Sequence, residues 1–234
     1  MVKSMRFPIL RLADFPFSAL TYPGRRPRFS FFFTHRGIYR CSLRSMNELL
    51  TARHLAPVSE RIPVLAYGSN ACPSQLFRKY NQDSRLTDIP VVYGRINNAD
   101  VVYSRRITQG GYVPATLVRA RRSLPSWITL LTPEQLRAMD STEGRPNLYQ
   151  LVEVPRLKFF AGRLQISPLF SYLDVSGGVM IFKRRPVSLR TVRQKKCQSI
   201  FQSTTRHDAQ RWLAFTQVPA SETPETRAQL SVAR

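Results

Sequence analysis

Short runs of β-branched and aromatic residues recur along the middle of the chain, and their spacing limits the fold more than any other feature. Glycine, asparagine and serine separate the runs, and few stretches between them have a helical period. The expected strands cover residues 62–67, 91–93, 99–104, 112–118, 127–131, 148–154 and 178–182. Many short strands with few helices predict an α+β fold built on a largely antiparallel sheet or a small barrel.

One helix is clearly signalled after the strand expected at residues 127–131. Thr132 and Gln135 have the spacing of a capping box, and Pro133 occupies the first helical position. Gly144 is a natural residue to end this helix because glycine adopts left-handed backbone angles at little cost. The sequence therefore predicts a helix from residue 133 to about residue 143.

Glu143 is the first candidate for chemistry. It lies in the last turn of the expected helix, where the dipole disfavours a carboxylate, and Asp140 adds a like charge three residues earlier. Both effects favour a carboxylate that takes up and releases a proton near neutral pH, as a general acid and base does. The alternative is an exposed glutamate at a helix end, paired with Arg145 or Arg137.

A glycine-containing turn follows the strand expected at residues 62–67. Gly68 permits backbone angles that expose successive N–H groups, and Ser69 and Asn70 add side-chain donors. Such a turn can hold a carboxylate or a developing oxyanion, and a purely structural turn is the alternative. A short helix is expected behind it at residues 75–80. Cys72 could be a nucleophile, but we do not favour this role because nothing in the sequence places a histidine beside it as the activating base.

The order and spacing of these motifs resemble the γ-glutamylcyclotransferase-like family. The resemblance covers about residues 62–190, and it rests on residues 67–70, 114–118, 131–136 and 139–144, with Tyr149 beyond them. Tyr172 and residues 176–178 and 185–189 are similar to a C-terminal stretch of some bacterial members. Met139 stands where leucine is more usual in the family, a nearly volume-conserving difference.

The resemblance implies an enzyme that cyclises a γ-glutamyl group to 5-oxoproline and releases an amine or an amino acid, with no cofactor or metal. It also implies a small, mostly antiparallel β-barrel flanked by helices. Glu143 would be the catalytic acid and base. The substrate-binding residues would be Tyr67, Gly68, Ser69, Asn70 and Tyr149. The same fold without catalysis, as a silent binding module, is an alternative.

Positive charge is concentrated at the two ends of the chain. There are 36 lysines and arginines against 14 acidic residues, a net charge of +22, and residues 1–45 and 183–234 each contribute +8. Seven cations lie within residues 183–196. This segment favours a second function of another class, non-specific contact with nucleic acid or an acidic partner. A solvated basic face is the alternative.

Composition also predicts a division of the chain. Residues 1–45 are basic, rich in proline and without a regular period, so we expect a poorly ordered extension that contributes little to the core. A transit peptide, or a leader ahead of a start at Met46, are alternatives for it. Residues 46–200 are expected to form the γ-glutamylcyclotransferase-like domain, and residues 201–234 a C-terminal helix and a flexible tail.

Cysteine and histidine are used sparingly. Three of each are scattered without ligand spacing, so we expect neither a disulfide framework nor a metal centre, and a reducing, cytoplasmic location. No apolar run approaches the ~18–20 residues that a membrane span needs, so no membrane partner is expected.

Overall fold

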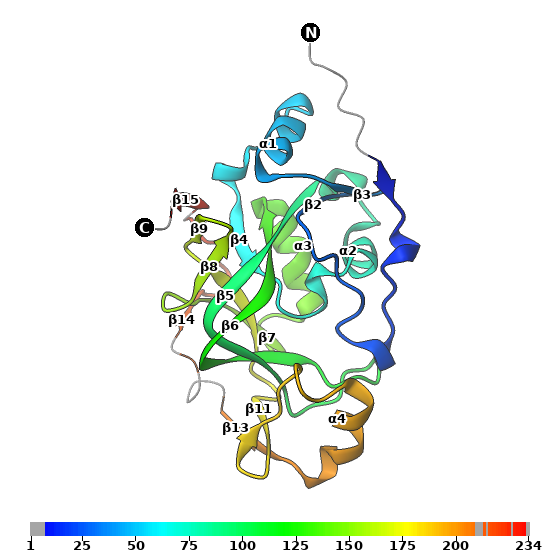
Figure 1. The fold of residues 1–234 in the computed structure, drawn as a ribbon, viewed down its shortest axis with the longest axis vertical. Helices are drawn as coiled ribbons and strands as arrows, with labels where there is room; N and C mark the ends of the chain where they lie inside the picture. Colours follow the sequence, from blue (N-terminus) through cyan, green and yellow to red (C-terminus); the bar gives the residue numbers. More distant parts are fainter. Residues whose placement is uncertain (1–7, 209–212, 214, 226, 233–234) are drawn as a thin grey trace.

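Most strands of the chain lie in one large sheet, with helices packed beside it (Figure 1). The computed structural model describes residues 8–208, 213, 215–225 and 227–232. Within these ranges it has four α-helices, a sheet of 12 strands and a separate sheet of three. The predicted α+β class is therefore confirmed. The helices are α1 (Leu43–Ala52), α2 (Pro73–Tyr80), α3 (Pro133–Glu143) and α4 (Gln194–Ile200).

Hydrogen-bonded neighbours in the large sheet follow the order β1-β3-β2-β5-β6-β4-β10-β7-β14, with β8, β9 and β15 attached through β5. Only β4 and β10 run parallel among these described pairs. The end strands β1 and β14 are not paired with each other, so the described residues show no closed barrel, and that part of the prediction is not confirmed. The strands of the large sheet are β1 (Ile9–Leu10), β2 (Phe31–Thr34), β3 (Gly37–Arg40), β4 (Ile62–Leu65), β5 (Ile89–Tyr103), β6 (Ala115–Leu131), β7 (Tyr149–Glu153), β8 (Lys158–Ala161), β9 (Leu164–Ser167), β10 (Phe170–Asp174), β14 (Thr216–Gln217) and β15 (Gln229–Val232).

The centre of the sheet is one long hairpin where the sequence predicted four separate strands. β5 and β6 pair along nearly their whole lengths, and the chain reverses only between them, around Gly110 and Gly111 (Figure 1). Between the strands expected at residues 112–118 and 127–131 the chain does not turn. Residues 120–122 are an irregularity in the pairing, opposite Asn98. Polar residues on the exposed side of a strand look like turn residues in the sequence, which explains the error.

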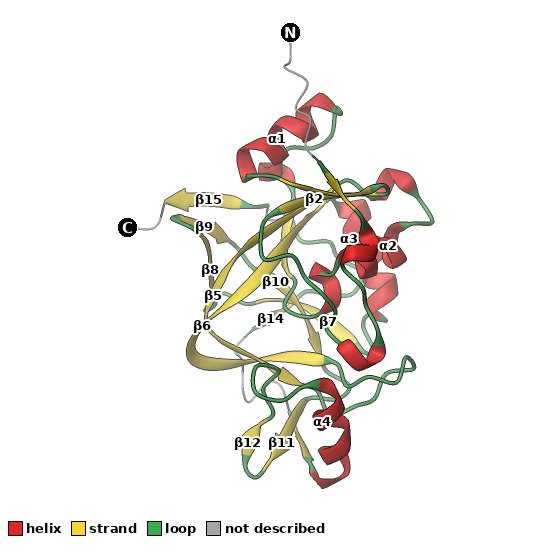
Figure 2. Cartoon of the chain, turned by 45° about the vertical axis from the view of Figure 1, so that its right-hand side comes forward, coloured by secondary structure: helices red, strands yellow, loops and turns green. Residues whose placement is uncertain are grey.

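Helix α3 begins and ends where its sequence signals place it. The Gln135 backbone N–H donates to Thr132 Oγ1 (3.3 Å), and the Thr132 N–H donates to Gln135 Oε1 (3.0 Å). Gly144 follows with φ 64° and ψ 38°, the left-handed conformation of a helix stop. α2 lies beside α3 on the same side of the sheet (Figure 2). Tyr80 Oη on α2 donates to the Gln135 carbonyl oxygen (2.9 Å).

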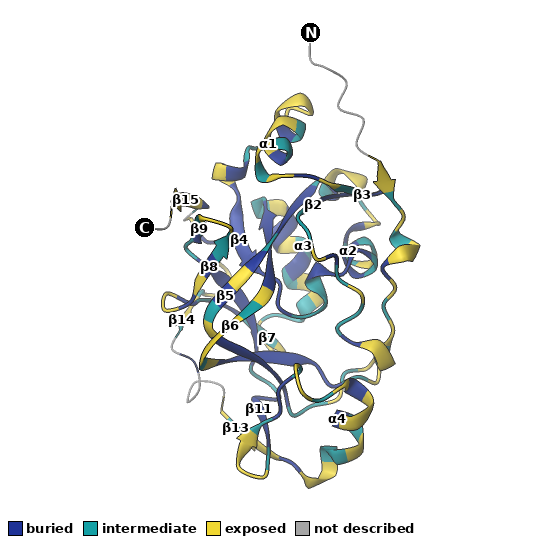
Figure 3. Ribbon diagram, in the orientation of Figure 1, coloured by how far each residue is buried: buried dark blue, intermediate teal, exposed yellow. Residues whose placement is uncertain are grey.

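The N-terminal segment is packed into the protein, contrary to the prediction that residues 1–45 contribute little to the core. β2 lies between β3 and β5, and its residues Phe31, Phe32 and Phe33 are fully buried (Figure 3). Phe31 and Phe33 pack in one hydrophobic cluster and Phe32 in the other. A strand buried on both faces reads as a continuous apolar run without alternation, so it gives no period-2 signal. Residues 1–7 lie outside the described residues.

The C-terminal part also differs from its prediction. The described residues after Ile200 form a 3₁₀ turn (Phe201–Ser203) and short strands, and none of them belongs to an α-helix. β13 (Thr205–His207) pairs with β11 (Val179–Phe182), which also pairs with β12 (Arg185–Pro186), while β14 and β15 join the large sheet. The C-terminal helix expected within residues 201–234 is therefore not found there. Residues 209–212, 214, 226, 233 and 234 lie outside the described part.

Candidate active site

The sequence-predicted site residues gather around a small recess at the end of α3. The recess has a volume of about 30 Å³, enough for one small polar group rather than a whole ligand. It is lined by Tyr22, Leu65, Ala66, Tyr67, Gly68, Ser69, Asn70, Ala115, Glu143, Tyr149 and Tyr172. An outer cavity of about 600 Å³ shares Tyr22, Ser69, Glu143 and Tyr149 with it. All six residues predicted to act in the site therefore lie at one place.

Glu143 is held by its neighbours through one carboxylate oxygen. Its Oε1 accepts a hydrogen bond from Asn70 Nδ2 (2.9 Å) and contacts the ammonium group of Lys79. The side chains of Glu143 and Lys79 are only 11% and 9% exposed. Glu143 Oε2 accepts no hydrogen bond from any described residue. One oxygen thus fixes the side chain and the other is available to a ligand.

The charged partners of Glu143 differ from those expected. Asp140 does not act as a like charge beside it, since its carboxylate pairs with Arg145 (Nη1–Oδ2 2.9 Å) and accepts a hydrogen bond from Tyr172 Oη. Arg145, an expected partner of Glu143, is thereby used elsewhere. Lys79 was missed because its proximity depends on the packing of α2 against α3.

The turn at residues 67–70 connects β4 to α2 and approaches Glu143 through Asn70. Residues Ser69–Ala71 form one 3₁₀ turn, and α2 begins at Pro73. A Cβ atom at Gly68 would lie 2.8 Å from Tyr22 Oη, so the absence of a side chain is what lets the turn pack against this tyrosine. Glycine is required at this position because the backbone approaches Tyr22 too closely to leave room for a side chain.

Two residues of the N-terminal segment support the recess, and one of them, Tyr22, also lines it. Tyr22 Oη accepts a hydrogen bond from the Ala115 N–H (2.9 Å), and its ring stacks on Tyr112 with centroids 4.8 Å apart. Arg26 Nη1 donates to the Tyr67 carbonyl oxygen (2.7 Å), and its guanidinium lies over the Trp127 ring. Neither residue was predicted to lie near the site, because residues 1–45 were expected to lie apart from the domain.

The tyrosines of the recess remain neutral hydrogen-bonding groups. Burial raises the pKa of Tyr22, Tyr67, Tyr149 and Tyr172 above the ordinary value for tyrosine. Tyr67 Oη donates to the Tyr172 carbonyl oxygen, which joins β4 to β10. Tyr149 lies under the guanidinium of Arg106, 5.1 Å from the ring centroid, and Arg106 pairs with the buried Asp174.

Thiol and metal chemistry have no support from the described residues. Cys72 is buried, its Sγ donates to the Phe15 carbonyl oxygen (3.4 Å), and burial raises the pKa of its thiol. The described part of the chain contains no group of three or more His, Cys, Asp or Glu side chains placed to hold a metal ion. Nor do the described helices include one with the length and apolarity needed to cross a membrane.

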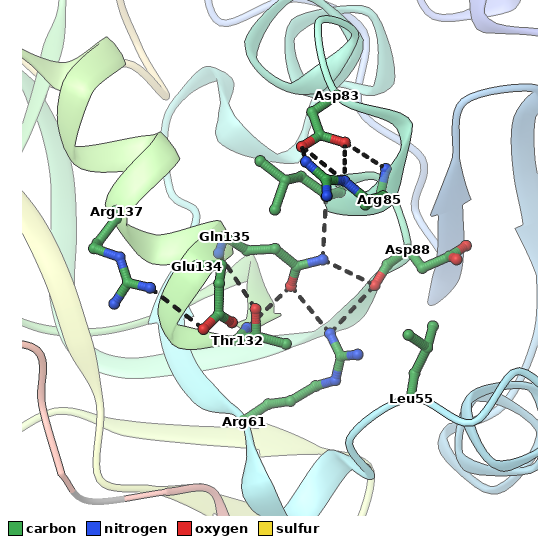
Figure 4. A pocket seen from close by; sticks show the side chains of 10 residues that line it. Leu55, Arg61, Asp83, Arg85, Asp88, Thr132, Glu134, Gln135 and Arg137 are labelled. Carbon is green, nitrogen blue, oxygen red and sulfur yellow. Dashed lines mark hydrogen bonds and ion pairs between the residues drawn. The ribbon is translucent and has the colours of Figure 1, made fainter.

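Another cavity, of about 520 Å³, lies at the start of α3, and the residues that line it form a structural network (Figure 4). Arg61 is 1% exposed there, and its Nη1 donates to Gln135 Oε1 (3.1 Å) and the Leu130 carbonyl oxygen (3.2 Å). Burial lowers the pKa of Arg61 to about 10. The acids lining this cavity are all ion-paired: Asp83 with Arg85, Asp88 with Arg53 and Glu134 with Arg137. The network fastens α3 to β4 and β6.

Comparisons with known proteins give weak structural matches. No family model matches the chain, and no curated protein matches it. A solved γ-glutamyl cyclotransferase matches with a TM-score of 0.40 and 17% identity, covering 49% of this chain and 67% of that one. An uncharacterised protein from Homo sapiens gives a TM-score of 0.38 and 13% identity, covering 64% and 90% respectively. Matches this distant establish neither the family nor the activity, which must be argued from the site.

Proposed function

We propose that the protein is an enzyme of the γ-glutamylcyclotransferase type, which converts a γ-glutamyl group to 5-oxoproline and releases an amine or an amino acid. The observation that carries the proposal is the arrangement at Glu143. Asn70 and Lys79 hold Oε1, and Oε2 is left without a hydrogen bond from the described residues, in a side chain that lines both cavities. The family's small β-barrel and a cytoplasmic location belong to the same proposal.

The reaction is an intramolecular acyl transfer. The α-amine of the substrate attacks its own γ-carbonyl carbon, a C–N bond forms, and the bond from that carbon to the leaving nitrogen breaks. Glu143 takes the proton that the amine loses and delivers it to the leaving nitrogen. Because the new ring has five members and both reacting groups belong to one molecule, positioning supplies much of the acceleration.

The remaining predicted residues would position the substrate. The recess beside Gly68, Ser69 and Asn70 has room for a carboxylate or a carbonyl oxygen, and donors from this turn would stabilise the negative charge that develops there. Tyr67 supports the turn through its bond to β10, and Tyr149 offers a neutral phenol at the boundary of the recess and the outer cavity. We assign these five residues to substrate binding.

The direct test is an assay of the purified protein with a panel of γ-glutamyl amines and γ-glutamyl dipeptides. We expect at least one compound to yield 5-oxoproline and the free amine in equal amounts, without added metal or nucleotide. Chromatography with mass detection measures both products. If no member of the panel reacts, the protein is better described as a binding module of this fold.

A second candidate function concerns the basic segment at residues 183–196. Its seven cations are all exposed, and no ion pair joins them to other described residues. Lys183 and Arg184 form the turn between β11 and β12 with positive φ (49° and 63°), where asparagine and glycine are favoured. We propose that this surface binds the phosphates of nucleic acid without sequence preference.

Such binding should depend steeply on salt. With up to seven phosphate contacts, counterion release predicts an affinity loss of up to roughly 10⁴-fold between 50 and 200 mM salt. Fluorescence anisotropy with a labelled duplex of mixed sequence measures it. Neutralising Lys183, Arg184, Arg185, Lys195 and Lys196 together should weaken binding and leave 5-oxoproline formation unchanged. Binding that ignores salt, or that selects a sequence, would contradict an electrostatic surface.

A further inference from the structure

The outer cavity beside Glu143 carries a charge that the proposed chemistry does not use. Its lining contains three cations, Arg78, Lys79 and Arg106, and a single acid, Glu143, among the residues the structure describes. Lys79 pairs with Glu143, and Arg106 pairs with Asp174, which lies behind it. Arg78 has no ion pair within the described residues. The cavity therefore presents one uncompensated positive charge.

Aromatic rings from the N-terminal segment and the hairpin loop hold that charge in place. The Arg78 guanidinium lies over the Phe17 ring, 5.7 Å from its centroid. Phe17 in turn packs edge-on against Tyr112, with centroids 5.7 Å apart. Burial and the negative charge of Glu143 raise the pKa of Tyr112, and the positive charges of Arg78 and Arg106 act in the opposite direction. Because Tyr112 lines the same cavity, the positive charge of Arg78 contributes to the electrostatic potential inside the cavity.

The rim of the cavity also exposes apolar surface. Ile107 is 54% exposed and Leu148 is 43% exposed, and both belong to the lining. The volume of about 600 Å³ exceeds what a γ-glutamyl group alone would fill and is typical of cavities that enclose a whole small-molecule ligand. A leaving group with an apolar body and a charged end would use this space.

We propose that Arg78 determines specificity by selecting γ-glutamyl compounds whose leaving amine carries an anionic group. The inference rests on the proposed function and adds to it the charge of the leaving group. The γ-glutamyl part would lie beside Glu143 and Ser69, and the anion of the leaving group would pair with the Arg78 guanidinium, which binds carboxylates bidentately. A leaving amine with a second positive charge would meet like charge at the same point.

A binding experiment tests this separately from turnover. N-Glutaryl-leucine lacks the α-amine of γ-glutamyl-leucine and cannot cyclise, and N-glutaryl-leucinamide differs from it only by the missing carboxylate. N-Glutaryl-cadaverine supplies a cationic leaving group. Calorimetry on the full chain should show the acid binding at least about ten-fold more tightly than the amide, as a charge-assisted hydrogen bond predicts, and the cationic compound binding most weakly.

The variant Arg78→Gln should bring the acid-to-amide ratio below about three-fold while the amide affinity stays within two-fold, since the amide does not use the charge. The matched control is Arg163→Gln, which removes the same charge from the exposed turn between β8 and β9. It should keep the wild-type ratio. Equal binding of acid and amide, binding of neither, or an unchanged ratio in Arg78→Gln would overturn the inference.

Turnover separates this inference from the proposed function. Selective binding of N-glutaryl-leucine with no 5-oxoproline from any γ-glutamyl compound of the panel would refute the cyclisation and leave the charge selection by Arg78 standing. Rapid cyclisation of γ-glutamyl-cadaverine in preference to γ-glutamyl-leucine would support the cyclisation and overturn the charge selection.

Discussion

Replacing Glu143 with glutamine is expected to lower the rate of 5-oxoproline formation by roughly 10²–10⁴-fold, the usual contribution of a positioned acid and base. Glutamine keeps the size of the side chain, and its amide oxygen can still accept from Asn70. It cannot take a proton from the substrate amine. The rate should be measured at saturating concentration of a verified substrate, so that kcat is compared.

The same substitution should also cost stability, because it removes the charge that faces Lys79 in a mostly buried pair. We expect a loss of about 1.5–3 kcal/mol in the free energy of unfolding, the range for a hydrogen bond to a charged group. Lys79→Gln is the matched control, since it breaks the same ion pair and keeps the base. It should lose similar stability and no more than about ten-fold in kcat, less than the loss of the base itself. Near-normal turnover by Glu143→Gln would refute the assignment of the base.

Truncating Phe32 to alanine should destabilise the protein by about 3–5 kcal/mol, the cost of removing a fully buried phenylalanine side chain. That is a large part of the 5–15 kcal/mol by which a typical domain is stable. Urea unfolding followed by tryptophan fluorescence should show a lower midpoint at an unchanged slope. Deleting residues 1–45 should remove β2 from beside β5, together with β1 and β3, and prevent folding.

Leu20→Ala is the control for this prediction. Leu20 belongs to the same N-terminal segment but is 69% exposed, so its truncation should change stability by less than about 0.5 kcal/mol. If Phe32→Ala were equally harmless, or if the chain without residues 1–45 unfolded at the same urea concentration, the segment would not be part of the core.

The sequence by itself was sufficient to predict features that depend on interactions between residues close together in the chain. The capping box of Thr132 and Gln135 and the stop at Gly144 set the bounds of α3 through hydrogen bonds and backbone preferences local to the helix. The order of the motifs resembles that of a known family, and this resemblance predicted that the turn at residues 67–70, Glu143 and Tyr149 act together. The structure brings them together, and their roles stay predictions.

Only the tertiary structure decided which segments surround that site. The place of β2 depends on its pairing with β5, in which Phe31 lies opposite Val91, 60 residues further along the chain. A strand buried on both faces also carries no alternation to reveal it. The contact of Lys79 with Glu143 and the unpaired charge of Arg78 both follow from the packing of α2 against its neighbours. Local sequence patterns predict individual helices and turns. Which charges meet is fixed by long-range pairing and packing, because the groups that compensate a charge come from distant parts of the chain.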